Sequence, residues 1–286
     1  MATDSIRARV VLTVAGFDPS GGAGLIADVR ALVAFGCRPV AAMTSLTFQN
    51  SEGVVGAIHQ SADSLRAQVL PVVKEFRLAA VKIGMLPTRE LVLEVVRLLG
   101  ETNMPAPVID PVLCSSSGYE LMEPEAREAW LTELMPLARL ITPNIPEAEA
   151  LTGMQITNES DMRAAASKLR QTGARAVLVK GGHLGQRSEV RGQRSEKPPP
   201  KRQAIDLLDD EGTVTVFRGE WIDAPPVRGT GCMLSAAIAA GLAHGMKLNE
   251  SVGSAKRFVA DTIRYAPNLG PDPVTLELTE MTVLEQ

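Results

Sequence analysis

The sequence is poor in the residue types that mark several common classes of protein. It has three cysteines in 286 residues, Cys37, Cys114 and Cys232, and no C-x-x-C pair. An odd number of widely spaced thiols favours neither a disulfide framework nor a zinc knuckle, and free thiols fit a reducing cytoplasm. Aromatic residues make up 3% of the chain and the formal net charge is -4. Base-stacking surfaces and general binding to nucleic acid are therefore not expected.

Long apolar runs and the common nucleotide-binding motifs are also missing. The apolar run "VVLTVAG" near the start is too short to span a membrane and leads directly into the turn "FDPSGG". We therefore expect a cytoplasmic protein with no membrane partner. Neither G-x-G-x-x-G nor G-x-x-x-x-G-K-[ST] occurs, which disfavours a dinucleotide-binding fold and a P-loop protein.

Short aliphatic runs alternate with helical patterns along almost the whole chain. Runs such as "RVVLTVAG", "LAAVKIG" and "ARAVLVKGG" read as strands, and the segments between them read as helices. The helical pattern over residues 61–76 contains Pro71, where we expect a kink or a break. The alternation predicts one α/β domain over residues 1–286, with a mostly parallel sheet covered by helices on both faces. Ligands of such sheets bind beyond the carboxyl ends of the strands.

Residues 185–203 break the alternation. They contain the near repeat "GQRSEVR", "GQRSEK", followed by three prolines, and basic residues outnumber acidic ones. Such a segment cannot bury enough apolar surface to order itself, which predicts a disordered basic insertion within the domain. A basic docking segment is the alternative.

A Gly-rich turn follows the first predicted strand, in "AGFDPSGGAGLIADV". Glycines allow a ligand to approach the backbone closely, and Asp18 at the strand exit offers a polar contact. A purely structural turn explains the same residues equally well. At two other strand exits, Gln49 and Met85 could form an apolar slot with one amide, which suits a planar heterocycle.

A second Gly-rich turn, "RGTGC", precedes a helix rich in small residues near the end of the chain. Gly229, Thr230, Gly231 and Cys232 would present successive N–H groups to an anion at the helix N-terminus. A tight turn without a ligand is the other interpretation.

Three further strand exits carry charged or amide side chains. Asp110 ends "VID", Asn144 and Glu147 follow "LITP", and Lys180 ends "VLVK". Mg²⁺ bound to a nucleotide needs few protein ligands, so scattered carboxylates and an amide suffice. Each acid alone would more simply be a helix cap or a surface charge. The lysine could meet a phosphate as a point charge.

These motifs together resemble the hydroxymethylpyrimidine/phosphomethylpyrimidine kinases of thiamine biosynthesis, within the ribokinase-like superfamily. The resemblance rests on "AGFDPSGGAGLIADV", "TSLTFQNSEGV", "VKIGML", "VIDPV", "TPNIPEAEALTG", "VLVKGGH" and "RGTGCMLSAAIAAGLA", which occur in the order of the family. It implies a three-layer α/β/α fold and a homodimer. It also implies two ATP-dependent reactions, which convert 4-amino-5-hydroxymethyl-2-methylpyrimidine to its monophosphate and then to the diphosphate.

The resemblance also implies roles for individual residues. Gly16 and Asp18 would belong to the substrate segment, Gln49 would read the pyrimidine edge and Met85 would cover the ring. Asp110 and Glu147 would bind magnesium, and Asn144, Glu147 and Lys180 would contact the nucleotide. The anion hole for the transferred phosphoryl group would consist of Gly229, Thr230 and Gly231.

Two residues of the anion-hole segment leave questions open. Cys232 takes the position of the aspartate base of related sugar kinases, and it is either the proton acceptor or a positioning residue. A helix N-terminus would lower the pKa of its thiol. Arg228 stands where the family commonly has His, and it either binds phosphate or points to solvent. Pyridoxal kinase-like activity and a catalytically silent pyrimidine sensor are the competing functions.

Overall fold

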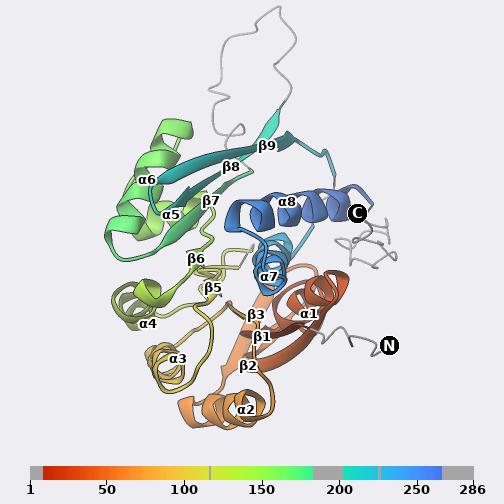
Figure 1. Ribbon diagram of the computed structural model, residues 1–286, viewed down its shortest axis with the longest axis vertical. Helices are drawn as coiled ribbons and strands as arrows, with labels where there is room; N and C mark the ends of the chain where they lie inside the picture. Colours follow the sequence, from red (N-terminus) through yellow and green to blue (C-terminus); the bar gives the residue numbers. More distant parts are fainter. Residues whose placement is uncertain (1–8, 116, 183–201, 225–226, 266–286) are drawn as a thin grey trace, which may run out of the picture.

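The computed structural model describes residues 9–115, 117–182, 202–224 and 227–265. Their strands form one nine-stranded sheet in the order β3-β2-β1-β4-β5-β6-β7-β8-β9 (Figure 1). The strands are β1 (Arg9–Phe17), β2 (Cys37–Gln49), β3 (Val54–His59), β4 (Ala80–Ile83), β5 (Val108–Ile109), β6 (Leu140–Ile141), β7 (Ala176–Gly181), β8 (Gln203–Asp210) and β9 (Thr213–Glu220).

The centre of the sheet is parallel and its edges are antiparallel. Strands β2, β1, β4, β5, β6 and β7 pair in parallel, whereas β3 pairs with β2, and β8 with β7 and β9, in antiparallel fashion. Six parallel strands therefore end at the same edge of the sheet, which is where the sequence predicts the ligands to bind.

Helices cover both faces of the sheet, as predicted. The helices are α1 (Gly24–Ala34), α2 (Ala62–Glu75), α3 (Arg89–Glu101), α4 (Pro124–Ala129), α5 (Ile145–Thr152), α6 (Glu159–Gln171), α7 (Thr230–Ala243) and α8 (Leu248–Arg264), with a π turn η1 (Trp130–Leu134) and a 3₁₀ turn η2 (Met135–Leu137). Buried residues of α2 to α6 form one apolar cluster with the sheet, and those of α1, α7 and α8 form another on the opposite face (Figure 1).

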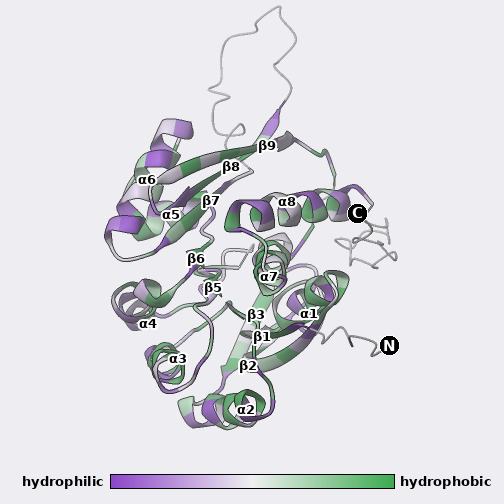
Figure 2. Cartoon of the chain, in the orientation of Figure 1, coloured by the Kyte–Doolittle hydropathy of each residue, from purple (hydrophilic) through white to green (hydrophobic). Residues whose placement is uncertain are grey.

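The strand side chains divide between these two clusters by alternation. In β7, Val177 and Val179 belong to the first cluster, and Ala176 and Leu178 belong to the second. This is the period of two that a strand buried on both faces requires. Hydrophobic residues accordingly follow the central strands, and hydrophilic ones gather on the outer helices (Figure 2).

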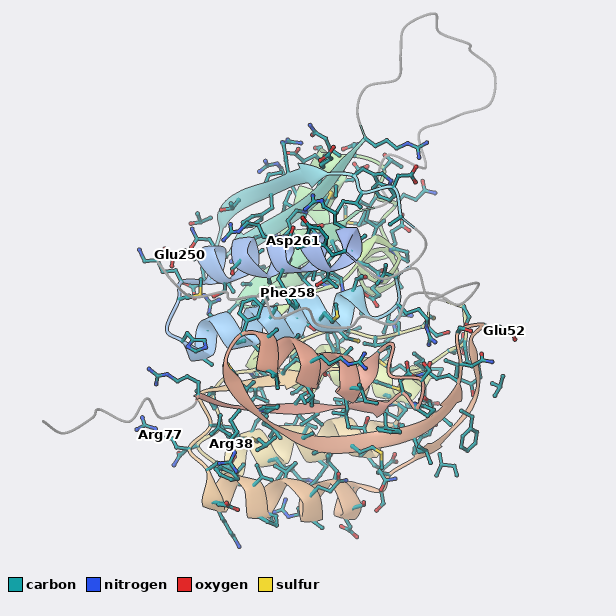
Figure 3. The ribbon with its side chains drawn as sticks, turned by 90° about the vertical axis from the view of Figure 1, so that its right-hand side faces the viewer. Arg38, Glu52, Arg77, Glu250, Phe258 and Asp261 are labelled. Carbon is teal, nitrogen blue, oxygen red and sulfur yellow. The ribbon has the colours of Figure 1, made fainter. Side chains whose placement is uncertain are left out.

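Helix α7 is the most deeply buried helix because another helix covers it. Its small residues Ala236, Ala237 and Ala240 are fully buried against the sheet and α1. Phe258 of α8 lies between α8 and α7 and meets Phe35 edge to face, with ring centroids 5.2 Å apart (Figure 3). This packing holds α7 between the sheet and α8.

Two local predictions differ from the structure. Strand β3 was not predicted, because its short run is interrupted by Gly56 and reads as part of the loop that follows β2. Helix α2 continues through Pro71 without the expected break. Ala67 and Pro71 are both exposed, so water can bond the carbonyl that the proline leaves free.

Figure 3 shows Glu52 at the outer end of the β2–β3 hairpin.

Part of the predicted basic insertion lies outside the described residues. Residues 185–201 fall there, whereas Gln203 is already the first residue of β8, so the insertion ends earlier than predicted. Within the described ranges, no helix combines the length and the apolar character needed to cross a membrane.

Candidate active site

A cavity of about 1960 Å³ opens at the carboxyl edge of the parallel strands. Its lining includes one or more residues at the end of every parallel strand: Gly16, Gln49, Met85, Asp110, Asn144 and Lys180. A pocket for a single small ligand measures about 300–1,000 Å³. This cavity is therefore large enough to hold two ligands side by side, such as a phosphoryl donor and an acceptor.

Gln49 and Met85, the two residues predicted to contact a ring, lie with Gly16 at one end of the cavity. A Cβ on Gly16 would lie 2.9 Å from Sδ of Met85, so the absence of a side chain at Gly16 lets Met85 lie flat against β1. Met85 itself is 6% exposed. Gln49 lines the same end, whereas Asp18 is almost fully buried and lies behind the cavity wall.

The N-terminus of α7 points into the centre of the cavity. Gly229 is the residue that precedes the helix, and its φ of 71° lies in the left-handed region. A Cβ there would come within 2.1 Å of the carbonyl oxygen of Gly22, so the two Gly-rich turns are packed backbone to backbone. The first N–H groups of α7, those of Thr230, Gly231 and Cys232, have no partner within an α-helix and are available to an anion.

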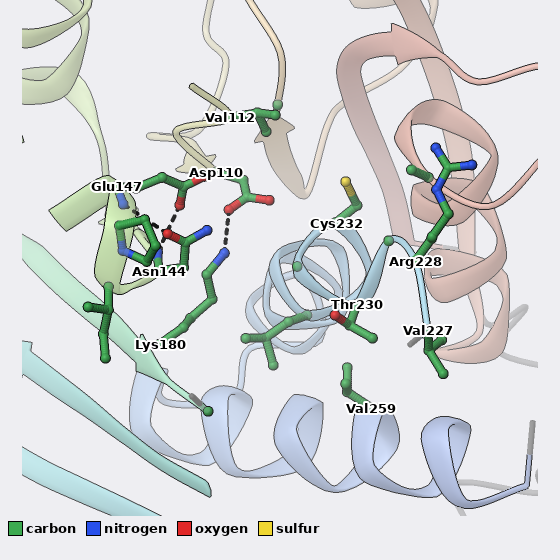
Figure 4. A pocket seen from close by; sticks show the side chains of 18 of the residues that line it. Asp110, Val112, Asn144, Glu147, Lys180, Val227, Arg228, Thr230, Cys232 and Val259 are labelled. Atoms are coloured by element: carbon green, nitrogen blue, oxygen red, sulfur yellow. Dashed lines mark hydrogen bonds and ion pairs between the residues drawn. The ribbon is translucent and has the colours of Figure 1, made fainter. Parts of the chain in front are cut away.

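A buried ion pair faces this helix end. Nζ of Lys180 lies 2.8 Å from Oδ1 of Asp110, and Thr142 donates to the same oxygen at 3.0 Å (Figure 4). A Cβ on Gly231 would lie 3.2 Å from the lysine Nζ and 3.5 Å from Oδ2 of Asp110, which shows how closely both groups approach α7. Burial lowers the pKa of Lys180, but the neighbouring acids Asp110 and Glu147 raise it to about 12, so the ammonium stays charged.

Asn144 and Glu147 form a capping box at the start of α5. The Asn144 side chain accepts from the Glu147 N–H at 2.9 Å, and the Glu147 carboxylate accepts from the Asn144 N–H at 2.8 Å. Both residues also line the cavity beside Lys180 (Figure 4). Burial raises the pKa of Glu147 to about 7 in spite of the nearby lysine.

The pKa of Cys232 is shifted in the direction opposite to the one that the sequence predicts. Removal of the thiol from water raises its pKa to about 11. The nearby cation of Lys82 lowers the pKa, but its effect is smaller than that of desolvation. The predicted lowering by the helix N-terminus is therefore wrong for the resting protein, because burial dominates. At neutral pH the group is a protonated thiol.

Among the described residues, no group of three or more His, Cys, Asp or Glu side chains is placed to hold a metal ion. Asp110 and Glu147 line the cavity as separate carboxylates. Oδ2 of Asp110 accepts no hydrogen bond from the described residues. Such a sparse set fits Mg²⁺ that is held mainly by phosphates and water, and it does not fit a closed protein cage.

Two parts of the cavity were not predicted from the sequence. Lys82 lines its floor and was not singled out, although it stands in the quoted motif "VKIGML". Lys256, Val259 and Ile263 of α8 line the side opposite the sheet. Their spacing of three and four residues marks one face of a helix, and this was the signal available in the sequence.

A family model described as phosphomethylpyrimidine kinase matches residues 18–276 of the chain. The chain belongs to this family. It is 38% identical over 268 residues to the hydroxymethylpyrimidine/phosphomethylpyrimidine kinase of Streptomyces coelicolor, a match that covers 94% of this chain and 93% of the relative. The resemblance stated from the sequence motifs is therefore confirmed.

Solved structures agree with this assignment. The phosphomethylpyrimidine kinase of Clostridium difficile has a TM-score of 0.74 at 36% identity, and the match covers 89% of this chain and 99% of that one. An ADP complex of Bacillus subtilis pyridoxal kinase has a TM-score of 0.78 at 32% identity, over 92% and 94% of the two chains. The predicted three-layer, mostly parallel fold is confirmed, and pyridoxal kinases are structural neighbours of this phosphomethylpyrimidine kinase family member.

Proposed function

We propose that this chain transfers the γ-phosphoryl group of ATP to the 5-hydroxymethyl oxygen of 4-amino-5-hydroxymethyl-2-methylpyrimidine, and then phosphorylates the monophosphate to the diphosphate, in thiamine biosynthesis. The observation that carries this proposal is the Asp110–Lys180 pair facing the N-terminus of α7 in a cavity large enough for two ligands. In the first reaction a P–O bond to the alcohol forms, the bond from the γ-phosphorus to ADP breaks, and the alcohol proton is released.

The chain's own groups supply positive charge around the transferred phosphoryl group. The N–H groups of Thr230, Gly231 and Cys232 would bind its oxygens, and Lys180 would act as a point charge beside them. Phosphoryl transfer depends mainly on positioning and on neutralising such oxygens. Asp110 and Glu147 would hold Mg²⁺, which supplies further charge neutralisation when bound.

The acceptor would occupy the end of the cavity beside Gly16. Met85 would cover one face of its ring, and Gln49 would bond its polar edge. Asp18 lies behind this end and would act on the substrate through its neighbours. The nucleotide, with Asn144 and Glu147 near its phosphates, would extend toward α8, where Val259 and Ile263 present apolar surface to a base.

Cys232 would enter the reaction as a neutral thiol that positions the acceptor hydroxyl. A raised pKa of about 11 supports this role over that of proton acceptor, because a thiol that is already protonated cannot take a second proton. Substitution Cys232→Ser distinguishes the two. Substantial remaining activity supports positioning, whereas near-complete loss supports the role of base.

A coupled assay of ADP formation tests the proposed function. Mg²⁺ and ATP are supplied with the pyrimidine alcohol and, separately, with its monophosphate, and turnover of both is expected. Ligand binding without ADP formation would instead indicate a pyrimidine sensor. Against a sensor stands the complete set of Asp110, Glu147, Lys180 and the α7 N-terminus.

Pyridoxal kinase activity is the second candidate, and the similarity to the Bacillus subtilis pyridoxal kinase favours it. Pyridoxal is also a planar ring with a hydroxymethyl group and would fit beside Met85. Comparison of kcat/KM for pyridoxal with kcat/KM for the pyrimidine alcohol distinguishes the two activities. A tenfold preference for pyridoxal, or ~1.4 kcal/mol in transition-state binding, would overturn the first assignment.

We also propose that the protein is a single domain that acts as a cytoplasmic homodimer. The single continuous sheet supports a single domain. The edge strand β3 supports self-association, because its apolar residues Val55 and Ile58 are 82% and 56% exposed. Sedimentation of wild type against Val55→Lys tests the dimer. A monomeric wild type would contradict it, and cell fractionation tests the location.

A further inference from the structure

Arg228 joins three separate segments of the chain at the acceptor end of the cavity. Its Nη2 donates to Oε1 of Gln49 at 2.8 Å, and its Nη1 donates to Oγ of Ser20 at 3.4 Å and to the carbonyl of Asn50. Nη2 also lies 3.7 Å from Oδ2 of Asp18. The side chain is 14% exposed, so it does not point to solvent, which was one of the two possibilities left by the sequence.

The contact with Arg228 decides which way the Gln49 amide faces. A guanidinium has only donors, so the atom opposite Nη2 must be the amide oxygen and not the amide nitrogen. With its oxygen engaged, Gln49 presents Nε2 as its remaining polar group. That nitrogen has no partner among the described residues, and Gln49 lines the cavity. The amide therefore offers a bound ring a hydrogen-bond donor.

The charge of Arg228 is already compensated. Oδ1 of Asp18 accepts from the N–H and the hydroxyl of Ser20, at 2.8 and 2.7 Å. Oδ2 of Asp18 is buried and has no hydrogen-bond partner in the described structure, so the guanidinium at 3.7 Å is its nearest compensating charge. Moving Arg228 toward a phosphate would leave the Gln49 oxygen unpaired and the buried carboxylate of Asp18 without its counter-charge, which is costly.

We propose that Arg228 is a positioning residue that fixes Gln49 as a hydrogen-bond donor to an unprotonated ring nitrogen of the acceptor, and thereby determines which ring edge the enzyme accepts. This inference rests on the proposed function. A ring that presents an N–H or amino group at the same point would place donor against donor. The pyrimidine must therefore bind with a ring nitrogen, not its exocyclic amino group, against Gln49.

Steady-state kinetics of four variants test this inference. Arg228→Met is expected to raise KM for the pyrimidine alcohol by about tenfold, with kcat and KM for ATP little changed, because only the amide orientation is lost. Gln49→Glu keeps an acceptor for Arg228 but has no donor, so it should raise KM as much as Gln49→Ala does. The double variant Arg228→Met/Gln49→Ala should equal Gln49→Ala alone, because the arginine then has nothing to orient.

Arg228→Lys is the conservative control, because its ammonium can still donate to the Gln49 oxygen. Its KM for the pyrimidine alcohol is expected to lie between those of wild type and Arg228→Met. If Arg228→Met fails to fold in a thermal melt, Arg228→Lys and Gln49→Glu carry the test. Additive effects in the double variant would overturn the inference, and so would an unchanged KM in Arg228→Met. A KM that rises much more for the monophosphate than for the alcohol would also overturn it and would make Arg228 a phosphate ligand.

Wild-type turnover separates this test from the test of the proposed function. If the wild type forms ADP with the alcohol but the coupling between Arg228 and Gln49 is absent, only the inference fails. If the wild type turns over neither pyrimidine, the proposed function fails and the inference fails with it.

Discussion

The ammonium of Lys82 lies 2.9 and 2.7 Å from the two carboxylate oxygens of Asp28, and both side chains are fully buried. Thr13 donates to the same carboxylate at 2.6 Å. The pair connects β4 to α1 at the cavity floor. A Cβ on Gly84 would lie 2.8 Å from the lysine Nζ, so Gly84 leaves the space that this ammonium occupies.

Loss of Lys82 should destabilise the protein strongly. Lys82→Met leaves the carboxylate of Asp28 buried without a counter-charge, which costs about 3–5 kcal/mol in the free energy of unfolding. Thr13→Val removes one hydrogen bond to the same group and should cost about 1 kcal/mol. The double variant Lys82→Met/Asp28→Asn should be more stable than Lys82→Met. Urea unfolding measures all three, and a Lys82→Met protein as stable as wild type would contradict the paired-charge description.

The stability of the metal-free protein should decrease as the pH rises toward neutrality. The pKa of Glu147 is raised from 4.5 to about 7, so the folded protein binds a proton more tightly than the unfolded chain does. The free energy of unfolding therefore falls between pH 4.5 and about 7, by on the order of 3 kcal/mol from this group.

Glu147→Gln isolates that contribution. Glutamine preserves the capping box with Asn144 but carries no charge. The melting temperature of the variant relative to wild type should therefore rise from pH 5 to pH 8 in buffer without divalent ions, while kinase activity with Mg²⁺ should fall. A difference in melting temperature that does not change with pH would contradict the raised pKa.

Gly229→Ala should disrupt the active site, whereas Gly100→Ala should not. A Cβ at Gly229 meets the Gly22 carbonyl at 2.1 Å in a left-handed conformation, so the turn has to move and the N-terminus of α7 with it. We expect at least a hundredfold loss of kcat/KM, or about 3 kcal/mol of transition-state stabilisation. Gly100 in α3 has nothing within 4 Å and ordinary φ, so alanine there should leave activity unchanged and raise stability by up to about 1 kcal/mol. Equal activities of the two variants would argue against a tightly packed turn.

The three thiols should react with iodoacetamide at different rates. Cys114 is exposed, whereas burial raises the pKa of both Cys37 and Cys232 to about 11. At pH 7.5 such a pKa leaves roughly 3 in 10,000 molecules as thiolate, so both of these thiols should be alkylated slowly. Peptide mass spectrometry over time measures the order, with Cys114→Ser as the control that removes the fast site. Rapid modification of Cys232 would show that its pKa is much lower.

The parallel part of the fold could be predicted because each strand–helix unit contains its own signal. The predicted strand exits at Asp110, Asn144 and Lys180 all lie at one cavity, since parallel strands end on one side of a sheet. Strand β3 carries no such signal, because its residues are ordered by pairing with β2. Gly56, for example, leaves room for the ring of Phe48, 3.0 Å from a Cβ placed there.

Local and distant contacts explain which site residues could be predicted. The motif "NIPE" carries the spacing of a capping box, so the bonds between Asn144 and Glu147 were readable from the sequence. The contact of Arg228 with Gln49 joins residues 179 positions apart, and no local pattern encodes it. The pKa of Cys232 likewise depends on burial by the whole fold, which outweighs the local helix N-terminus.

The packing of Gly229 against Gly22 has a consequence for synthesis of the protein. The turn between β1 and α1 leaves the ribosome about 200 residues before the turn that completes it, which precedes α7. Until α7 has emerged, the apolar face of β1 and β4 that it covers stays open to water. A nascent chain that stalls before residue 227 therefore has all nine described strands, lacks the turn proposed to bind phosphate, and exposes a surface that attracts chaperones.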